Sequence, residues 1–194
     1  MAEKYTEEIV NIEFDLFDKV NNYGGRASCQ DDFFTFNIMR SAQFDAWDDA
    51  TRESYLADLK ATSAEGRNLV MEKYAYMSGY DYMGEMDDFD EKKVLLAEIM
   101  EIMDADTIAM REEYPLLARQ GRPMEGESGA AVSVDRYLLC ELLTYSTATL
   151  RALRAHLDAL KAQGKTLPKL IMENTVHTYG YADLDAAEAR LASR

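Results

Sequence analysis

The chain has 194 residues, 47% of them apolar, which is enough for one compact domain with a sizeable hydrophobic core. Its 36 acidic residues outnumber 21 basic ones and give a net charge of −15, so its field repels phosphate backbones and anionic lipid surfaces. We therefore expect no nucleic-acid partner and no membrane association. Cys29 and Cys140 are too few for a disulfide framework or a four-cysteine zinc site. Without a long apolar run or a signal-type amino terminus, the sequence predicts a cytoplasmic protein.

The first half of the chain has the pattern of four helices, because apolar residues recur three and four positions apart without period-two alternation. The first expected helix carries an inward stripe of Ile9, Ile12, Leu16 and Val20 and ends before Gly24. Asp residues can cap the second and third helices. The predicted helices of this half span residues 6–22, 31–47, 48–66 and 68–77.

The second half repeats this plan after a link at residues 81–90, whose Asp, Tyr, Met and Gly fit no helical stripe. A long loop at residues 114–133 separates its first two helices. Ser146 can cap the next helix, Thr166 with Pro168 in the first turn opens the one after it, and Asp183 can cap the last. The predicted helices of this half span residues 91–113, 135–145, 146–164, 166–179 and 183–193.

The two halves resemble each other, as though one helical unit occurred twice. A shift of 101 positions superposes Phe36 on Tyr137, Ile38 on Leu139, Phe44 on Tyr145, Leu56 on Leu157, Leu59 on Leu160, Lys60 on Lys161, Ala61 on Ala162, Met71 on Met172 and Gly79 on Gly180. We predict an all-α fold, a helical bundle of two repeated halves related by a pseudo-twofold axis. The single domain, 1–194, would comprise repeat one at about 6–80, a linker at about 81–90, repeat two at about 91–181 and a short helix at 183–193.

Polar side chains are concentrated in one loop of the first half. Residues 24–32 contain Arg, Ser, Cys, Gln and two Asp, whereas the matching loop of the second half keeps only Gly121 and Arg122 before its polar character disperses. Duplicated folds often keep one specialised copy and use the other as scaffold. We therefore predict that the first loop is the working one.

The helix after this loop adds a polar stripe, because Asn37, Arg40 and Gln43 are spaced three residues apart. If the central helices of the two halves face each other, Arg40 can meet Glu141 as a partly buried ion pair. A guanidinium also suits the carboxylate or phosphate of a ligand. The sequence leaves both roles of Arg40 open, a structural brace and a ligand anchor.

Three residues of the first loop are candidates for catalysis. Cys29 lies near Arg26 and just before a helix amino terminus, and both features favour a reactive thiolate. Asp31 and Asp32 are candidate general bases, although Asp at this position also serves as a helix cap. A lone Cys in a loop is equally consistent with no catalysis, so the sequence does not decide whether the protein is an enzyme.

A second candidate site is a metal pair on the last long helix. Glu173 and His177 lie four positions apart, a spacing that suits a divalent metal if further ligands converge. The pair does not recur in the first half, as a symmetric dimetal bundle would require. We predict no metal and no cofactor.

Two motifs of the first half are specific: NNYGGRASCQDD at residues 21–32 and TFNIMRSAQF at residues 35–44. Through them the chain resembles an uncharacterised bacterial family known only as a domain of unknown function. The ending, ENTV at 173–176 and YGY at 179–181, is similar to that of the family. The resemblance spans nearly the whole chain. It implies a role for residues 24–43 and no particular reaction.

We predict a site for a small molecule between the two halves, formed by the 24–43 segment. An anionic metabolite is the expected ligand, because converging arginines otherwise need internal acids to neutralise them. The candidate ligand-binding residues are Arg26, Ser28, Gln30, Asn37, Arg40, Gln43 and Trp47. The alternative is a non-catalytic protein-interaction module whose polar groups pair only with one another. An open hollow at Arg26 and Arg40 would favour a ligand site, and a sealed, fully paired network would favour the interaction module. The sequence does not indicate the oligomeric state.

Overall fold

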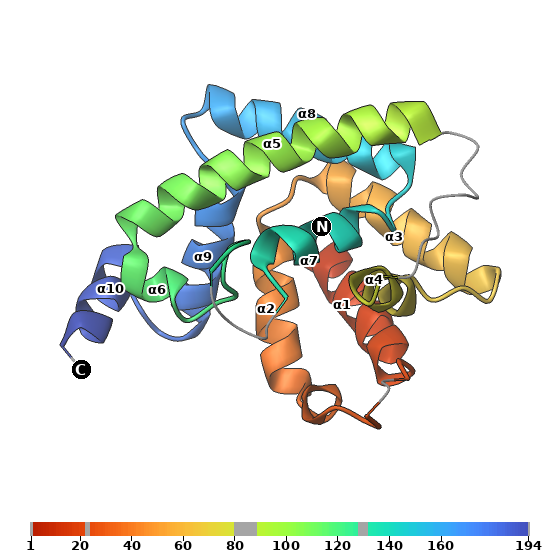
Figure 1. The fold of residues 1–194 in the computed structure, drawn as a ribbon, viewed down its shortest axis with the longest axis horizontal. Helices are drawn as coiled ribbons and strands as arrows, with labels where there is room; N and C mark the ends of the chain where they lie inside the picture. Colours follow the sequence, from red (N-terminus) through yellow and green to blue (C-terminus); the bar gives the residue numbers. More distant parts are fainter. Residues whose placement is uncertain (1, 22–23, 80–88, 128–131, 194) are drawn as a thin grey trace.

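The computed structural model describes residues 2–21, 24–79, 89–127 and 132–193, and every regular element within them is a helix (Figure 1). This confirms the predicted all-α class. In chain order the elements are α1 (Ala2–Asp18), η1 (Ser28–Asp31, a 3-10 helix), α2 (Phe33–Asp45), α3 (Asp49–Ala64), α4 (Leu69–Met77), α5 (Phe89–Glu113), α6 (Pro115–Ala118), α7 (Val134–Leu142), α8 (Thr147–Ala162), α9 (Leu167–Thr178) and α10 (Leu184–Ala192). The expected link at 81–90 lies outside the described residues except where α5 begins.

Helix α1 starts four residues before the predicted boundary and ends four residues short of it. Its last carbonyls are taken by side chains from elsewhere in the first half. The amide of Gln30 donates to Phe17 O at 2.8 Å and to Val20 O at 3.0 Å, and Asn68 donates to Leu16 O at 2.8 Å. These bonds satisfy carbonyls that would otherwise need a further helical turn. The end of α1 is therefore set by tertiary contacts, which the local sequence does not reveal.

Helix α6 lies inside the segment that the sequence predicts as a loop. Pro115 occupies its first turn, where the missing N–H costs nothing. The next two backbone N–H groups, of Leu116 and Leu117, each donate to the carboxylate of Glu188 at 2.8 Å. Glu188 is on α10, so a distant side chain supplies the cap that the sequence around α6 lacks.

Most predicted helix caps are present. Asp32, Asp48 and Asp183 accept the N–H of the third residue beyond them at the starts of α2, α3 and α10, and Ser146 does the same for α8. Thr166 stands at the cap position of α9 but its side chain makes no cap bond. Cap chemistry thus predicted four of these helix starts correctly.

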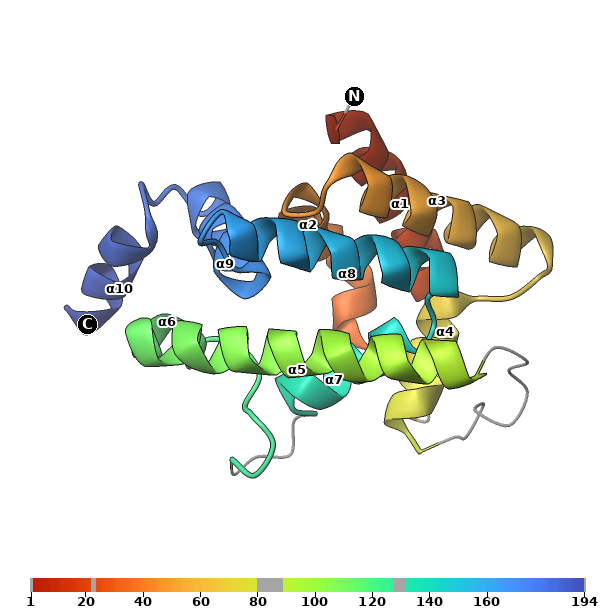
Figure 2. The same cartoon turned by 90° about the horizontal axis from the view of Figure 1, so that it is seen from above.

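The helices form two groups that pack against each other. Helix α1 packs on α2, α3 and α4, and α5 packs on α7, α8 and α9. Between the groups, α2 contacts α9, α4 contacts α7, and α3 contacts α8. Figure 2 shows α5 and α8 side by side along one flank, with α3 on the far side of α8. Asp58 of α3 ties the α3–α8 contact by accepting from Ser146 N at 3.0 Å and Thr149 Oγ1 at 2.7 Å.

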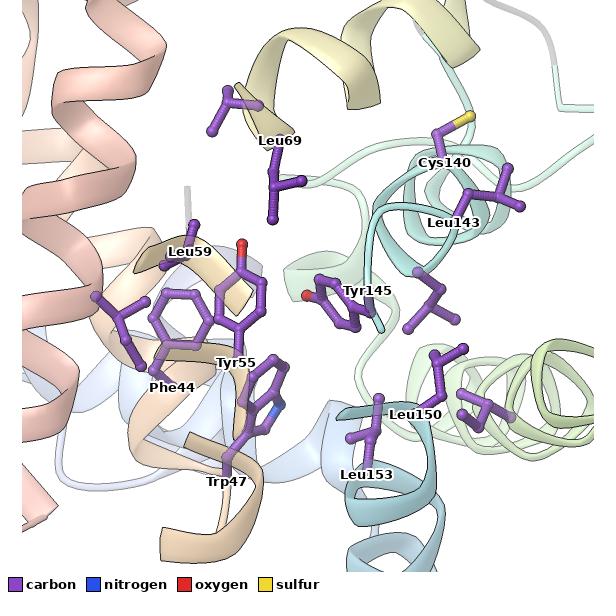
Figure 3. Close-up of a cluster of buried hydrophobic side chains, with 14 of the residues drawn as sticks. Phe44, Trp47, Tyr55, Leu59, Leu69, Cys140, Leu143, Tyr145, Leu150 and Leu153 are labelled. Carbon is purple, nitrogen blue, oxygen red and sulfur yellow. The ribbon is translucent and has the colours of Figure 1, made fainter. Parts of the chain in front are cut away.

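An aromatic cluster forms the middle of the main core. Phe44, Trp47 and Tyr55 come from the first half and Tyr145 from the second (Figure 3). Ring centroids are 5.0 Å apart for Phe44 and Trp47 and 4.7 Å apart for Tyr55 and Tyr145. All four side chains are buried. A smaller core at the other end joins the carboxyl end of α5 to α6, α9 and α10 through Met110, Tyr114, Leu117, Val176, Leu184 and Ala187.

The predicted shift of 101 positions aligns the starts of some helices and not of others. α2 and α7 begin 101 positions apart, at Phe33 and Val134, but α3 and α8 begin 98 positions apart, at Asp49 and Thr147. Glycines with positive φ follow the helices at both spacings: Gly66 and Gly164 are 98 apart, and Gly79 and Gly180 are 101 apart. The predicted pairing of Leu56 with Leu157 thus differs by three residues from the alignment of the starts of α3 and α8. Three residues are almost one helical turn, so the apolar stripes coincide in either register.

Candidate functional site

A buried ionic network joins the two halves at their centre. Arg40 of α2 forms a two-bond pair with Glu13 of α1, with Nε and NH2 each 2.6 Å from a carboxylate oxygen. The same guanidinium donates to Glu141 of α7, from NH2 at 3.0 Å and from NH1 at 3.2 Å. All three side chains are less than one-tenth exposed. The predicted pairing of Arg40 with Glu141 is confirmed, and Glu13 is a second acid on the same guanidinium.

The other members of the network complete its hydrogen bonding. Gln43 accepts from Arg40 NH1 at 2.8 Å and donates to Glu141 at 2.9 Å. Lys73 of α4 donates to Glu141 at 3.1 Å. The hydroxyl of Tyr55 donates to Glu13 at 2.6 Å, and that of Tyr145 donates to Glu141 at 2.8 Å. Two cations face two carboxylates, so the network is neutral and its charged groups are paired.

Burial and pairing act in opposite directions on these groups. Burial alone would raise the pKa of Glu141, but Arg40 and Lys73 hold that pKa well below the usual range. Burial alone would lower the pKa of Lys73, and Glu141 raises it above its ordinary value. Burial and the nearby carboxylates raise the pKa of Tyr55 and Tyr145 well above the usual value. At neutral pH both tyrosines are therefore protonated hydrogen-bond donors.

A solvent-open hollow of about 230 Å³ reaches the edge of this network from outside. We call it the Arg122 hollow. Its lining residues are Glu13, Phe17, Cys29, Asp32, Thr35, Phe36, Met39, Arg40, Val70, Lys73, Tyr74, Arg122 and Tyr137. They come from α1, η1, α2, α4, α7 and the loop after α6, so both halves contribute. Burial raises the pKa of Tyr74 to about 12, which keeps its hydroxyl protonated at neutral pH.

The second half supplies a stacked arginine to the hollow. The guanidinium of Arg122 lies over the ring of Tyr137, with its central carbon 4.4 Å from the ring centroid. Arg122 also donates to Val132 O at 3.2 Å. Lys73 approaches the same tyrosine and donates to its hydroxyl oxygen at 2.9 Å. Tyr137 therefore has two cationic neighbours at the boundary between the hollow and the ionic network.

The structure does not bring Arg26 or Ser28 to the hollow. Arg26 instead bonds Asp18, Asp31 at 2.8 Å and Gln30 O at 3.0 Å, and its side chain is 45% exposed. Ser28 is exposed in η1. Gln30 is buried and accepts from Ala27 N at 2.9 Å while its amide caps α1. The polar groups of this loop are thus engaged in holding the loop to α1.

The remaining ligand-binding candidates also lie in different surroundings. Asn37 is exposed and accepts from Ser41 Oγ at 3.3 Å, on a part of α2 that does not line the hollow. Trp47 is in the aromatic core rather than in the wall of a ligand site (Figure 3). Gln43 belongs to the ionic network. Of the seven candidates, Arg40 alone lines the hollow, and all its N–H donors are bound within the protein.

Two of the three catalytic candidates line the hollow. Cys29 is exposed there, and Asp32 lies at the edge, where its carboxylate accepts from Thr35 N at 3.0 Å. That backbone bond lowers the pKa of Asp32, so the carboxylate is charged and committed to capping α2. Asp31 points elsewhere and pairs with Arg26.

The Glu173 and His177 pair is on α9, as the spacing predicts. His177 Nε2 is 2.9 Å from Ala182 O, and Glu173 lines a separate surface depression beside α5. Within the described ranges no group of three or more His, Cys, Asp and Glu side chains has the arrangement of a metal site.

Among the helices described, none has the length and apolar character required to span a bilayer.

The sequence analysis missed Glu13, Lys73, Arg122 and Tyr137. Glu13 and Lys73 did leave a signal, because each is a charged residue on the inward stripe of its helix, between Ile9 and Leu16 in α1 and beside Val70 and Tyr76 in α4. Charged residues at such positions are rarely buried without a partner. The approach of Arg122 to Tyr137 leaves no such signal, because it depends on the path of a loop.

The fold and the central network define an all-α protein whose two helical groups are joined by buried ion pairs. The chain belongs to the family described as Protein of unknown function (DUF4125), whose model matches residues 3–189. The resemblance to a family of unknown function, stated from the sequence motifs, is confirmed. Comparison with curated proteins and comparison with solved structures both give no match.

Proposed function

We propose that the protein binds a small anionic molecule in the Arg122 hollow. The observation that carries the proposal is that Arg122, exposed in an open hollow of a chain whose net charge is −15, has no carboxylate partner among the described residues. An arginine left without a carboxylate in so acidic a protein favours an anionic ligand at that point. Aromatic and apolar side chains form the rest of the wall, as is common in small-molecule sites between helices.

The proposal differs from the sequence hypothesis in where the site lies. The 24–43 segment supplies Cys29, Asp32, Phe36, Met39 and Arg40, while the rest of the lining comes from α1, α4, α7 and the loop that carries Arg122. Because Arg40 is fully bonded to Glu13, Gln43 and Glu141, and Lys73 is buried and bonded to Glu141 and Tyr137, their role is to hold the site together. Arg122 is the exposed cation of the lining that a ligand can reach.

A thermal-shift screen tests the proposal. The chain is heated with a panel of small carboxylates, sulfate and phosphate, because a ligand that binds only the folded state raises the melting temperature in proportion to RT ln(1 + [L]/Kd). We expect at least one anion to stabilise the parent chain. Arg122→Ala should abolish that shift without lowering the melting temperature of the free protein appreciably, since Arg122 is at the surface.

Arg119→Ala is the matched control, because Arg119 is an exposed arginine outside the hollow and its loss changes the net charge equally. It should keep the shift seen with the parent. An equal loss in the two variants would mean that the anion responds to overall charge, and the site would have to be abandoned. No shift with any anion would have the same consequence.

A second candidate function is a protein-interaction module with a purely structural ionic network. The observations that favour it are the complete pairing of Arg40 and the exposure of Phe34 and Met39 on α2, at 72% and 50%. Apolar side chains so exposed favour a docking surface when they are contiguous. Two results together would support this alternative: the parent chain binds no anion, and Phe34→Ser abolishes binding of a partner protein that the parent chain binds.

We further propose that residues 33–79 and 134–180 are copies of one unit related by a pseudo-twofold axis. The contacts support this, because exchanging α1 with α5, α2 with α7, α3 with α8 and α4 with α9 turns the α2–α9 contact into the α7–α4 contact and leaves α3–α8 unchanged. An experimental structure in which α2–α4 does not superpose on α7–α9 would contradict it.

Two free thiols, Cys29 and Cys140, support placing the protein in the reducing cytoplasm.

A further inference from the structure

The charges around the Arg122 hollow differ in how completely they are paired. Arg40 and Lys73 are matched by Glu13 and Glu141 inside the network. Arg122 makes no ion pair with any carboxylate of the described residues, and its recorded partners are a backbone carbonyl and the Tyr137 ring. The carboxylate of Asp32 accepts from the amino terminus of α2 instead. Arg122 is therefore a cation of the hollow that has no carboxylate partner among the described residues.

The lack of a partner for Arg122 discriminates between anions. A monoanion supplies the one negative charge that Arg122 lacks. A dianion brings a second negative charge beside Glu13 and Asp32 in a chain that is already strongly acidic, and no further free cation of the lining is there to meet it. The hollow is thus better suited to a carboxylate than to a phosphate ester.

The aromatic part of the wall of the hollow suits a flat ring. Phe17 stacks on Phe36 with centroids 5.4 Å apart and on Tyr74 at 5.9 Å, and the planes of each pair are within 21° of parallel. Met39 adds a polarisable thioether. An apolar cavity of about 150 Å³ is enough to hold benzene, so a hollow of about 230 Å³ accommodates one ring with a short substituent.

Tyr137 provides the second polar contact. Its hydroxyl oxygen accepts from Lys73, so its own hydrogen is left to donate, and no acceptor among the described residues takes it. Lys73 is bonded to Glu141 as well and is fixed in place. This O–H and the N–H groups of Arg122, whose guanidinium lies over the same ring, are two donors for the two oxygens of one carboxylate.

Building on the proposed function, we propose that the ligand is an aromatic monocarboxylate, with its carboxylate on Arg122 and the Tyr137 O–H and its ring against Phe17, Phe36 and Met39. Its affinity depends on three separable features: the single negative charge, the ring, and the hydroxyl of Tyr137.

Calorimetric titration of the full chain with four probes separates the first two features. Phenylacetate has an aromatic ring and one negative charge, and phenyl phosphate has a ring and two negative charges. Benzyl alcohol has the ring without a charge, and acetate has one negative charge without a ring. We expect phenylacetate to bind at least tenfold more tightly than each of the others. If phenyl phosphate or acetate binds as tightly as phenylacetate, the aromatic monocarboxylate class is wrong while anion binding in the hollow stands. If neither phenylacetate nor any other anion binds, both proposals fail.

Tyr137→Phe tests the hydroxyl. It should weaken phenylacetate about tenfold and leave the weak binding of benzyl alcohol unchanged, because the alcohol does not need an anion-directed donor. Tyr179→Phe, which removes the hydroxyl of an exposed tyrosine outside the hollow, is the matched control and should bind phenylacetate like the parent. Unchanged affinity of the Tyr137 variant would overturn its role as an anchor.

Lys73 loses a hydrogen-bond acceptor in the Tyr137 variant, so a second variant avoids that disturbance. Arg122→Gln keeps a polar side chain at the surface and leaves the network intact. It should reduce phenylacetate affinity at least tenfold and reduce the preference for phenylacetate over benzyl alcohol by the same factor. A variant that weakens both probes equally would show that Arg122 only shapes the wall, which would overturn the assignment of the carboxylate to it.

Discussion

The two Gly–Arg loops of this protein each precede a helix of the central network, α2 or α7, and have opposite surroundings. Arg26 follows Gly25 in the first half and is tied to Asp18, Asp31 and the Gln30 carbonyl, away from the seam. Arg122 follows Gly121 in the second half and stacks on Tyr137 at the mouth of a hollow. In the loop that is richer in polar residues, these side chains form hydrogen bonds within the loop and to α1. A loop rich in polar residues can therefore use them to hold its own conformation as readily as to bind a ligand.

The largest effect is expected where the helices after these two loops meet. Arg40→Met leaves Glu13 and Glu141 buried without their shared guanidinium, and breaking a buried pair in this way costs about 3–5 kcal/mol of unfolding free energy. Urea denaturation followed by circular dichroism measures the loss. Arg26→Met, the same change in the exposed loop arginine, should leave the urea midpoint within experimental error. A loss below about 1 kcal/mol for Arg40→Met would show that the network is not what joins the halves.

The next effect concerns the first loop directly. Gln30→Ala removes the amide that donates to the Phe17 and Val20 carbonyls at the end of α1; Phe17 O keeps the bond from Val20 N, but both carbonyls lose the buried donor, which costs about 2 kcal/mol. Thermal or urea unfolding measures this. If the first loop is structural, the variant should bind phenylacetate with parental affinity at temperatures where it is folded. Loss of binding with unchanged stability would restore the first loop as the functional one.

A smaller and graded effect is expected from pH. The pKa of Glu141 is lower in the folded protein than in the unfolded chain, so the unfolded state binds its proton first and stability falls as pH drops below the ordinary Glu value of about 4.3. Each such carboxylate contributes up to about 1.4 kcal/mol per pH unit. The raised pKa values of Lys73, Tyr55 and Tyr145 give the opposite sign, a loss that begins as pH rises past about 10. Urea midpoints measured from pH 3 to 11 should therefore show a plateau with two flanks, and Glu141→Gln should have a shallower acid flank than the parent.

The smallest effect is chemical and leaves stability unchanged. Cys29 is exposed at the hollow, whereas Cys140 is fully buried and burial raises the pKa of its thiol. Iodoacetamide should therefore modify Cys29 in the native protein and Cys140 only after unfolding, and mass spectrometry of the two peptides can follow both. A rate for Cys29 well above that of free glutathione would support the nucleophile hypothesis. A rate equal to it would leave Cys29 as a lining residue only, and Cys29→Ser should then bind phenylacetate like the parent.

The sequence predicted the parts of this fold that local chemistry controls. Helical periodicity, the Asp32, Asp48 and Asp183 caps, and the pairing of Arg40 with Glu141 all follow from residue type and spacing. The end of α1 and the existence of α6 could not be predicted, because they depend on side chains that approach from distant elements, Gln30 for the one and Glu188 for the other.

The candidate site was less predictable than the fold for the same physical reason. Whether a polar side chain binds a ligand depends on whether the folded chain has already satisfied it, and Gln30 and Arg26 are satisfied by groups that are within the same loop or in α1. The signal that was available came from Glu13 and Lys73, charged residues on otherwise apolar helix faces. Such residues indicate a buried pair more reliably than a polar loop indicates a ligand.

The central network also constrains how the protein can be made. Of its four charged members, Glu13, Arg40 and Lys73 emerge from the ribosome with the first half, and only Glu141 comes from the second. Until residue 141 has been synthesised, the nascent helices carry two cations for one carboxylate, so sealing them together would bury an ammonium group without its partner. We therefore expect the packing around Lys73 to be completed only after α7 is made, and a fragment cut between the halves to hold its α4 less firmly than the full chain does.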